Sequence, residues 1–236
     1  MPKFNLVLST SLVTAMVISG LLTPLAPTTQ AQTNLSRSWQ EIFQDFFKNK
    51  EDNDDRTGAG AGGGISRDNS CPILQLALRT NTEVWSDRPV FLWKGKLSRI
   101  GIRNAESDRV LWNQSLAATD TEFTSIPYTG EPLEPGQSYQ WLIFDRENDS
   151  TPQRLVQFKV MDAQERDRIS LDLLVLRREL RAKGATPEEI ALARANYFAQ
   201  KGLWSDVLQE VYSVENPSEA LSNIIQQIPN ELCSPP

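Results

Sequence analysis

The sequence contains no histidine and only two cysteines. Histidine is the commonest general base and metal ligand, so its absence excludes Ser-His-Asp and Cys-His catalysis. Two cysteines alone cannot supply the four ligands of a structural zinc ion. We therefore expect no metal, no cofactor and no enzymatic role. A carboxylate pair of the kind that glycosidases use is the remaining catalytic alternative. The candidates are predicted loop acids: Asp120 with Glu122, and Asp145 with Glu147 and Asp149.

Basic residues are also in deficit, with 24 Lys and Arg against 30 Asp and Glu, a net charge of −6. Proteins that bind nucleic acid normally carry a basic patch and a high isoelectric point. The isoelectric point here is about 4.9. Nucleic acid is therefore excluded as an expected partner.

Long apolar runs are missing after the N-terminus. The run at residues 6–22 follows the charge of Lys3 and precedes Pro24 and Pro27, which is the order of a secretory signal peptide. Serine, threonine and glycine interrupt it, and it falls short of the roughly 20 apolar residues that span a membrane. We expect cleavage after Ala31, so residues 1–31 are the signal peptide. The mature chain is expected to be periplasmic or extracellular, with no transmembrane span.

Residues 32–50 are predicted to hold a short amphipathic helix that begins with a capping box of Ser38 and Glu41. Its apolar side chains recur at helical spacing: Trp39, Ile42, Phe43, Phe46 and Phe47. Residues 51–70 are acidic and then rich in glycine and alanine, a composition typical of a flexible linker. Because this linker separates the helix from the rest of the chain, we predict that Trp39, Phe43 and Phe46 dock onto a partner rather than complete the core.

Residues 71–160 change to a period of two, with short apolar runs separated by turn residues. The first run contains Leu74, Leu76 and Leu78, and about six others follow it. This spacing predicts an antiparallel β-sandwich. Residues 133–141 resemble the turn and strand that carry the tyrosine corner of immunoglobulin-like and fibronectin-type-III-like domains.

Residues 161–232 are predicted to be helical, which makes the fold class α+β. Three capping boxes mark helix starts, at residues 162–165, 186–189 and 216–219, and Lys201-Gly202 breaks one helix. Residues 195–217 resemble one tetratricopeptide-like hairpin. We expect Trp204 to be core, whereas Tyr197 and Tyr212 are expected to line a groove for a protein partner.

The two cysteines, Cys71 and Cys233, stand at opposite ends of the folded region. In an exported chain such a pair is a candidate disulfide. Two unpaired buried thiols are the alternative. The sequence leaves both open.

Tryptophans in the β region suggest a second function, because an exposed row of aromatic rings can stack on sugars. The residues concerned are Trp85, Trp93, Trp112 and Trp141. We expect Trp93 and Trp141 to be core and Trp85 to be partly exposed. A carbohydrate-binding module is therefore the alternative function.

The glycine tract at residues 62–64, the pair Cys71-Pro72 and the aromatic stretch at residues 87–93 resemble a family of exported cyanobacterial proteins of unknown function. The resemblance implies a signal peptide, a glycine-rich linker and a β domain, but no activity. Together these features predict an exported, non-enzymatic interaction or scaffolding module whose partner is an envelope or extracellular protein.

Overall fold

The computed structural model describes residues 37–56, 71–72, 83–107, 109–116, 123–146 and 148–233. All of them belong to one of the two units of the chain, Leu35–Pro236. The predicted signal peptide, most of the predicted linker and the predicted first strand, residues 74–79, lie outside the described residues. The sheets and helices described below all belong to this one unit.

Helix α1 (Trp39–Arg56) begins where the sequence predicts a helix start. The Ser38 backbone N–H donates to the Glu41 carboxylate at 2.6 Å, and the Glu41 N–H donates to Ser38 Oγ at 3.3 Å. This is the predicted capping box, which satisfies N–H groups that the first turn leaves free. The helix continues to Arg56, into the segment predicted to be linker.

Two sheets are formed by the described strands. One has the strand order β1-β3-β6 and the other the order β2-β8-β7-β4-β5. Their bounds are β1 (Cys71–Pro72), β2 (Glu83–Val84), β3 (Val90–Lys94), β4 (Arg99–Asn104), β5 (Val110–Ser115), β6 (Phe123–Pro127), β7 (Ser138–Phe144) and β8 (Arg154–Val160). Neighbouring strands are antiparallel, except that β2 runs parallel to β8. The prediction of a purely antiparallel arrangement is wrong at this edge, where two residues of β2 extend the sheet.

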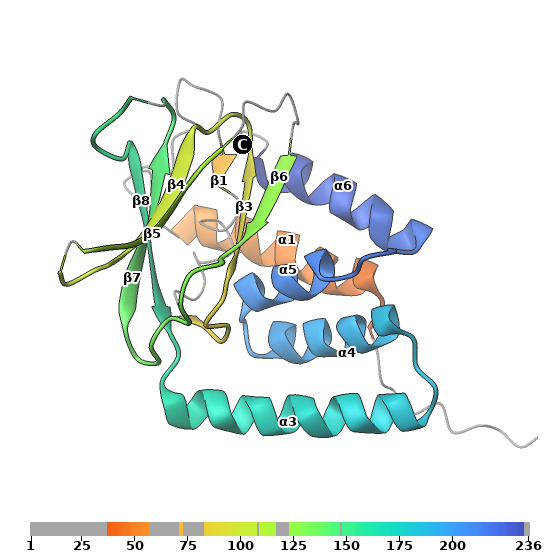
Figure 1. The fold of residues 1–236 in the computed structure, drawn as a ribbon. Helices are drawn as coiled ribbons and strands as arrows, with labels where there is room; N and C mark the ends of the chain where they lie inside the picture. The colour runs from red at the N-terminus through yellow and green to blue at the C-terminus, as the bar shows by residue number, and fades with distance from the viewer. Residues whose placement is uncertain are drawn as a thin grey trace, which may run out of the picture. The chain divides into compact units, whose positions relative to one another are not determined.

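Strand β3 is buried on both faces. Phe91 and Trp93 belong to the core between the two sheets, together with Trp141 of β7, whereas Leu92 belongs to the core that the helices share. Successive side chains of a strand point to opposite faces, so burial on both sides explains why this strand is apolar throughout. Figure 1 shows β3 and β6 between the larger sheet and the helices.

Four helices follow the strands: α3 (Ala163–Ala182), α4 (Pro187–Gln200), α5 (Trp204–Tyr212) and α6 (Glu219–Cys233). The capping box at the start of α4 is confirmed, because Thr186 Oγ1 accepts the Glu189 N–H at 3.2 Å and the Glu189 carboxylate accepts the Thr186 N–H at 2.7 Å. The break before α5 is confirmed as well. Gly202 adopts a φ of +71° there, a left-handed conformation that glycine adopts without a steric penalty.

The other two predicted capping boxes differ in the structure. The Asp162 carboxylate pairs with Lys159 Nζ at 3.3 Å instead of capping α3. Helix α6 is capped by Ser218, whose Oγ accepts the Leu221 N–H at 3.3 Å, and not by Asn216. Both predictions rest on spacing alone. In the structure, Lys159 pairs with the carboxylate expected to cap α3, and the Ser218 hydroxyl caps α6 in place of the Asn216 amide.

A disulfide joins Cys71 in β1 to Cys233 at the end of α6. Their Cα atoms are 5.9 Å apart, within the usual range for a bridge. The bond connects residues 162 positions apart and ties the last helix to the smaller sheet. Of the two alternatives that the sequence left open, the structure has the bonded pair.

Candidate functional site

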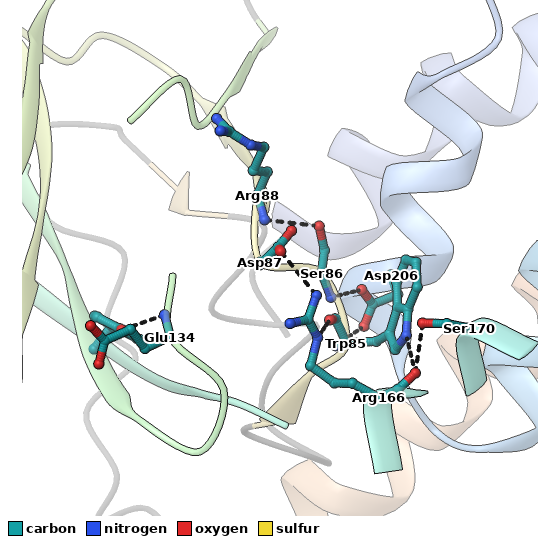
Figure 2. Close-up of polar contacts among 9 residues, drawn as sticks. Trp85, Ser86, Asp87, Arg88, Glu134, Arg166, Ser170 and Asp206 are labelled. Atoms are coloured by element: carbon teal, nitrogen blue, oxygen red, sulfur yellow. Dashed lines mark hydrogen bonds and ion pairs between the residues drawn. The ribbon is translucent and has the colours of Figure 1, made fainter. Parts of the chain in front are cut away.

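The loop after β2 joins the sheets to the helices, and we call the contacts of Trp85, Ser86 and Asp87 with Arg166 and Asp206 the junction. Asp206 is the third residue of α5, and its carboxylate accepts the backbone N–H groups of Trp85 and Ser86, each at 2.9 Å (Figure 2). A negative charge in the first turn of a helix is favoured by the helix dipole. Here the same carboxylate also holds a loop of the sheet region.

Asp206 is buried, with only 2% of the residue exposed. Burial disfavours the charged form and raises the pKa of Asp206 to about 7, although the two N–H donors act in the opposite direction. Glu210, one turn further along α5, raises this pKa, and Arg166 lowers it. The carboxyl group therefore gains or loses its proton near neutral pH.

Arg166 of α3 holds the same loop from another side. Its Nε donates to the Trp85 carbonyl at 2.7 Å, and its Nη2 pairs with the Asp87 carboxylate at 3.1 Å (Figure 2). In return, Trp85 Nε1 donates to the Arg166 carbonyl at 3.3 Å. The loop is thus bound through its backbone and its side chains, by α3 and by α5.

A second ion pair supports the junction from α4. Arg194 donates to both carboxylate oxygens of Glu210, with Nε at 2.8 Å and Nη2 at 2.6 Å. The Trp85 ring packs on Phe198 with 5.4 Å between ring centroids, and the Arg194 guanidinium lies 5.9 Å from the Trp85 ring. Fork-like arginine contacts of this kind fix both partners in orientation as well as in distance.

The contacts of the junction hold the loop after β2 against α3 and α5. The carboxylates and guanidinium groups of the junction bind backbone atoms and one another, and a partly buried network of this kind favours one arrangement of its parts. In the part of the chain that the structure describes, no three His, Cys, Asp or Glu side chains gather where they would hold a metal ion. We interpret the junction as the element that positions α3 and α5 against the sheets.

Helix α3 presents a different kind of surface. Leu171, Leu174 and Val175 are 63%, 52% and 55% exposed, and their i, i+3, i+4 spacing places them together on one face, the α3 patch. The opposite face buries Ile169 and Leu173. Figure 1 shows α3 running alongside α4. Single exposed apolar residues are ordinary, whereas a contiguous group on a helix is a candidate interaction site.

The prediction that Trp39, Phe43 and Phe46 form a docking element is wrong. They are 4%, 1% and 4% exposed and belong to the core that α3, α4, α5 and α6 share. The ring of Phe46 packs on Trp204 of α5, with centroids 4.7 Å apart. The apolar stripe of α1 is covered by the chain itself, because helices distant in sequence offer apolar faces of their own.

Tyr197 and Tyr212 are predicted to contact a protein partner, but in the structure both contact residues of the same chain. The Tyr197 hydroxyl donates to the Asp172 carboxylate at 2.6 Å, and burial together with this bond raises the Tyr197 pKa. Tyr212 stacks on Phe123 of β6 with centroids 5.3 Å apart, and burial raises its pKa too. Trp204 is core, as predicted, at 5% exposure.

The four tryptophans of the β region do not form an exposed row. Trp93 and Trp141 are buried, as predicted, at 2% and 0% exposure. Trp112 is half-buried between Phe91 and Tyr128. Trp85 is half-buried as well, and its indole contacts Phe198, Arg194 and the Arg166 carbonyl. This arrangement does not favour the carbohydrate-binding alternative.

The carboxylates considered for hydrolysis are placed only in part. Asp120, Glu122 and Glu147 lie outside the described residues. Asp145 pairs with Arg154 at 3.4 Å, and Asp149 accepts a hydrogen bond from the Gln153 side chain. The two described acids are therefore engaged in loop contacts.

Sequence reasoning did not single out Asp206, Arg166 or the α3 patch. Asp206 carries no local signal, since an acid in the first turn of a helix is ordinary. The α3 patch was visible in principle: residues 173–176 are four consecutive apolar residues, more than one buried stripe requires.

Comparison with protein-family models, with curated proteins and with solved structures finds no match for this chain. Within the described ranges, none of the helices combines the length and the apolar character needed to cross a membrane.

Proposed function

We propose that this chain is an exported, non-enzymatic interaction module of the cell envelope, and that the α3 patch is its binding face. The observation that carries the proposal is the exposure of Leu171, Leu174 and Val175 on a helix whose first turns are held by Arg166 at the junction. A helix anchored in this way presents its outer face with little freedom to adjust. Pre-organisation of this kind lowers the entropy cost of binding.

Export is supported by residues 1–31, which have the order of a signal peptide, and by the disulfide between Cys71 and Cys233. Structural disulfides persist mainly in oxidising compartments such as the periplasm or the exterior. Because the disulfide holds α6 against the smaller sheet, the proposed module would keep its helical layer in place outside the cell.

We further propose that the sheets are an immunoglobulin-like sandwich and that α4 and α5 are a tetratricopeptide-like hairpin. The first is supported by Tyr139, whose hydroxyl accepts the Glu134 backbone N–H at 2.8 Å, the bond of a tyrosine corner. The second is supported by the left-handed Gly202 at the turn and by the buried Ala191 and Ala195 of α4, which allow close helix packing.

The proposal is tested by affinity capture from an envelope extract with the mature chain, residues 32–236. Three baits are compared: the wild type, Leu174→Glu and the control Leu155→Glu. Leu155 is 44% exposed on β8, so its substitution adds the same charge away from α3. We expect the wild type and the control to retain the same proteins, and Leu174→Glu to lose them. If all three baits retain the same proteins, the α3 patch is not the binding face.

A further inference from the structure

We propose that the α3 patch binds a second copy of this chain, through an antiparallel pair of α3 helices related by a two-fold axis. This inference rests on the proposed function, because it names the partner of the same face. It is carried by the distribution of charge along α3, which is self-complementary only when the two helices run in opposite directions.

The exposed charges of α3 differ between its two ends. The half before the patch carries exposed Glu165 and Asp167, whereas the half after it is mainly basic. Arg168 and Glu179 are the exceptions. At 3.6 residues per turn they lie to the side of the patch face, as do Glu165 and Arg177, so the pairing depends on the charges on the patch face itself. The exposed basic residues of the second half are Arg177, Arg178 and Arg181, and Lys183 follows directly. In a chain of net charge −6, this basic segment beside an apolar patch is a local exception.

Asp167 and Arg178 lie on the same face as the patch. Residues 167, 171, 174, 175 and 178 follow the i, i+4, i+7, i+8, i+11 spacing of one helix face. At ~1.5 Å of rise per residue, Asp167 lies about 9 Å before the middle of the patch and Arg178 about 7.5 Å after it. In an antiparallel pair centred on the patch, Asp167 of each copy therefore comes opposite Arg178 of the other.

The same register brings the apolar side chains together. Leu171 of one copy comes opposite Val175 of the other, and the two Leu174 side chains meet near the axis. A two-fold pair uses the same surface on both subunits, so every favourable contact occurs twice. A parallel pair would instead place Asp167 against Asp167 and Arg178 against Arg178, which is repulsive.

A single pair of helices is a small interface compared with the roughly 1,200 Å² of total area that stable complexes bury. We therefore expect a reversible dimer with a dissociation constant on the order of 100 µM. Attachment to one envelope site or to a common partner would raise the local concentration and favour the pair.

The test is sedimentation equilibrium of the mature chain from low micromolar to about millimolar concentration. We expect the mass of the wild type to approach that of a dimer, and Leu174→Glu to weaken association at least tenfold. Asp167→Arg alone and Arg178→Asp alone should each weaken self-association, since each places like charges opposite one another. An equimolar mixture of these two variants should associate again, because the mixed pair restores both opposite-charge contacts.

Far-ultraviolet circular dichroism checks that each variant keeps its helices, and Leu155→Glu is the matched control that should associate like the wild type. A wild type that stays monomeric throughout overturns the inference, and so does a dimer that none of the α3 variants weakens. If the wild type is monomeric but Leu174→Glu loses proteins from the envelope extract, only self-pairing fails. If Leu174→Glu retains all of those proteins, the proposed function fails instead.

Discussion

Replacing Phe46 by alanine tests whether α1 belongs to the core. Phe46 is 4% exposed, and its ring packs on Trp204 at 4.7 Å between centroids. Burying a phenylalanine side chain stabilises by roughly 1.5–3 kcal/mol, and the cavity left by its removal adds to that loss. Alanine favours helices, so the backbone of α1 is not weakened. We expect the free energy of unfolding to fall by about 3–5 kcal/mol.

The assay is urea unfolding of the mature chain followed by circular dichroism, with Gln44→Ala as the matched control. Gln44 is exposed on the same helix, so its replacement should change the free energy of unfolding by no more than about 0.5 kcal/mol. A docking helix tethered by a linker would behave differently, because Phe46→Ala would then be as mild as the control. Equal effects of the two substitutions would refute the assignment of α1 to the core.

Two further substitutions test buried polar groups of α5. Asp206→Asn should flatten the pH dependence of the free energy of unfolding. In the folded chain Asp206 keeps its proton up to about pH 7, whereas in the unfolded chain it loses the proton near pH 3.8. The wild type therefore loses stability as the pH rises between these two values, and the variant should not. The loss amounts to ~4 kcal/mol over that window, and equal slopes for variant and wild type in urea unfolding at several pH values would contradict it. Tyr212→Phe should leave stability unchanged or raise it by about 1 kcal/mol, because the Tyr212 hydroxyl is buried without a hydrogen-bond partner among the described residues. A fall of more than about 1 kcal/mol in thermal or urea unfolding would show that this hydroxyl has a partner.

Local chemistry predicted the elements well. The strand from Arg99 to Asn104 and the strand from Arg154 to Val160 follow from alternation, and the helix that begins after Thr186 follows from its capping box. Each of these signals lies within about ten residues of sequence and reports a preference of the backbone at that place. A local preference is kept in the fold where it is compatible with the packing of elements that are distant in sequence.

The junction could not be predicted in this way. The hydrogen bonds from Trp85 and Ser86 to Asp206 join positions 121 and 120 residues apart, and nothing near either end indicates the other. The same holds for the disulfide, whose pairing was suggested by compartment and chain position but whose geometry depends on how α6 returns to β1. Long-range contacts depend on the packing of whole elements, which a single sequence does not encode locally.

Helix α3 shows why the sequence pattern pointed to a binding surface elsewhere. A clean apolar stripe, such as that of Trp39 and Phe46, suggests a face in need of an external cover. In a chain with several helices, however, regular apolar stripes are the faces through which the helices pack against one another. A better indicator of a binding surface is a helix that has apolar residues on two faces. In α3, Ile169 and Leu173 already form the face that packs on the core, and further apolar residues lie on the opposite face. That surplus confers no stability on the monomer, since its side chains stay in water, and we propose that another surface covers it.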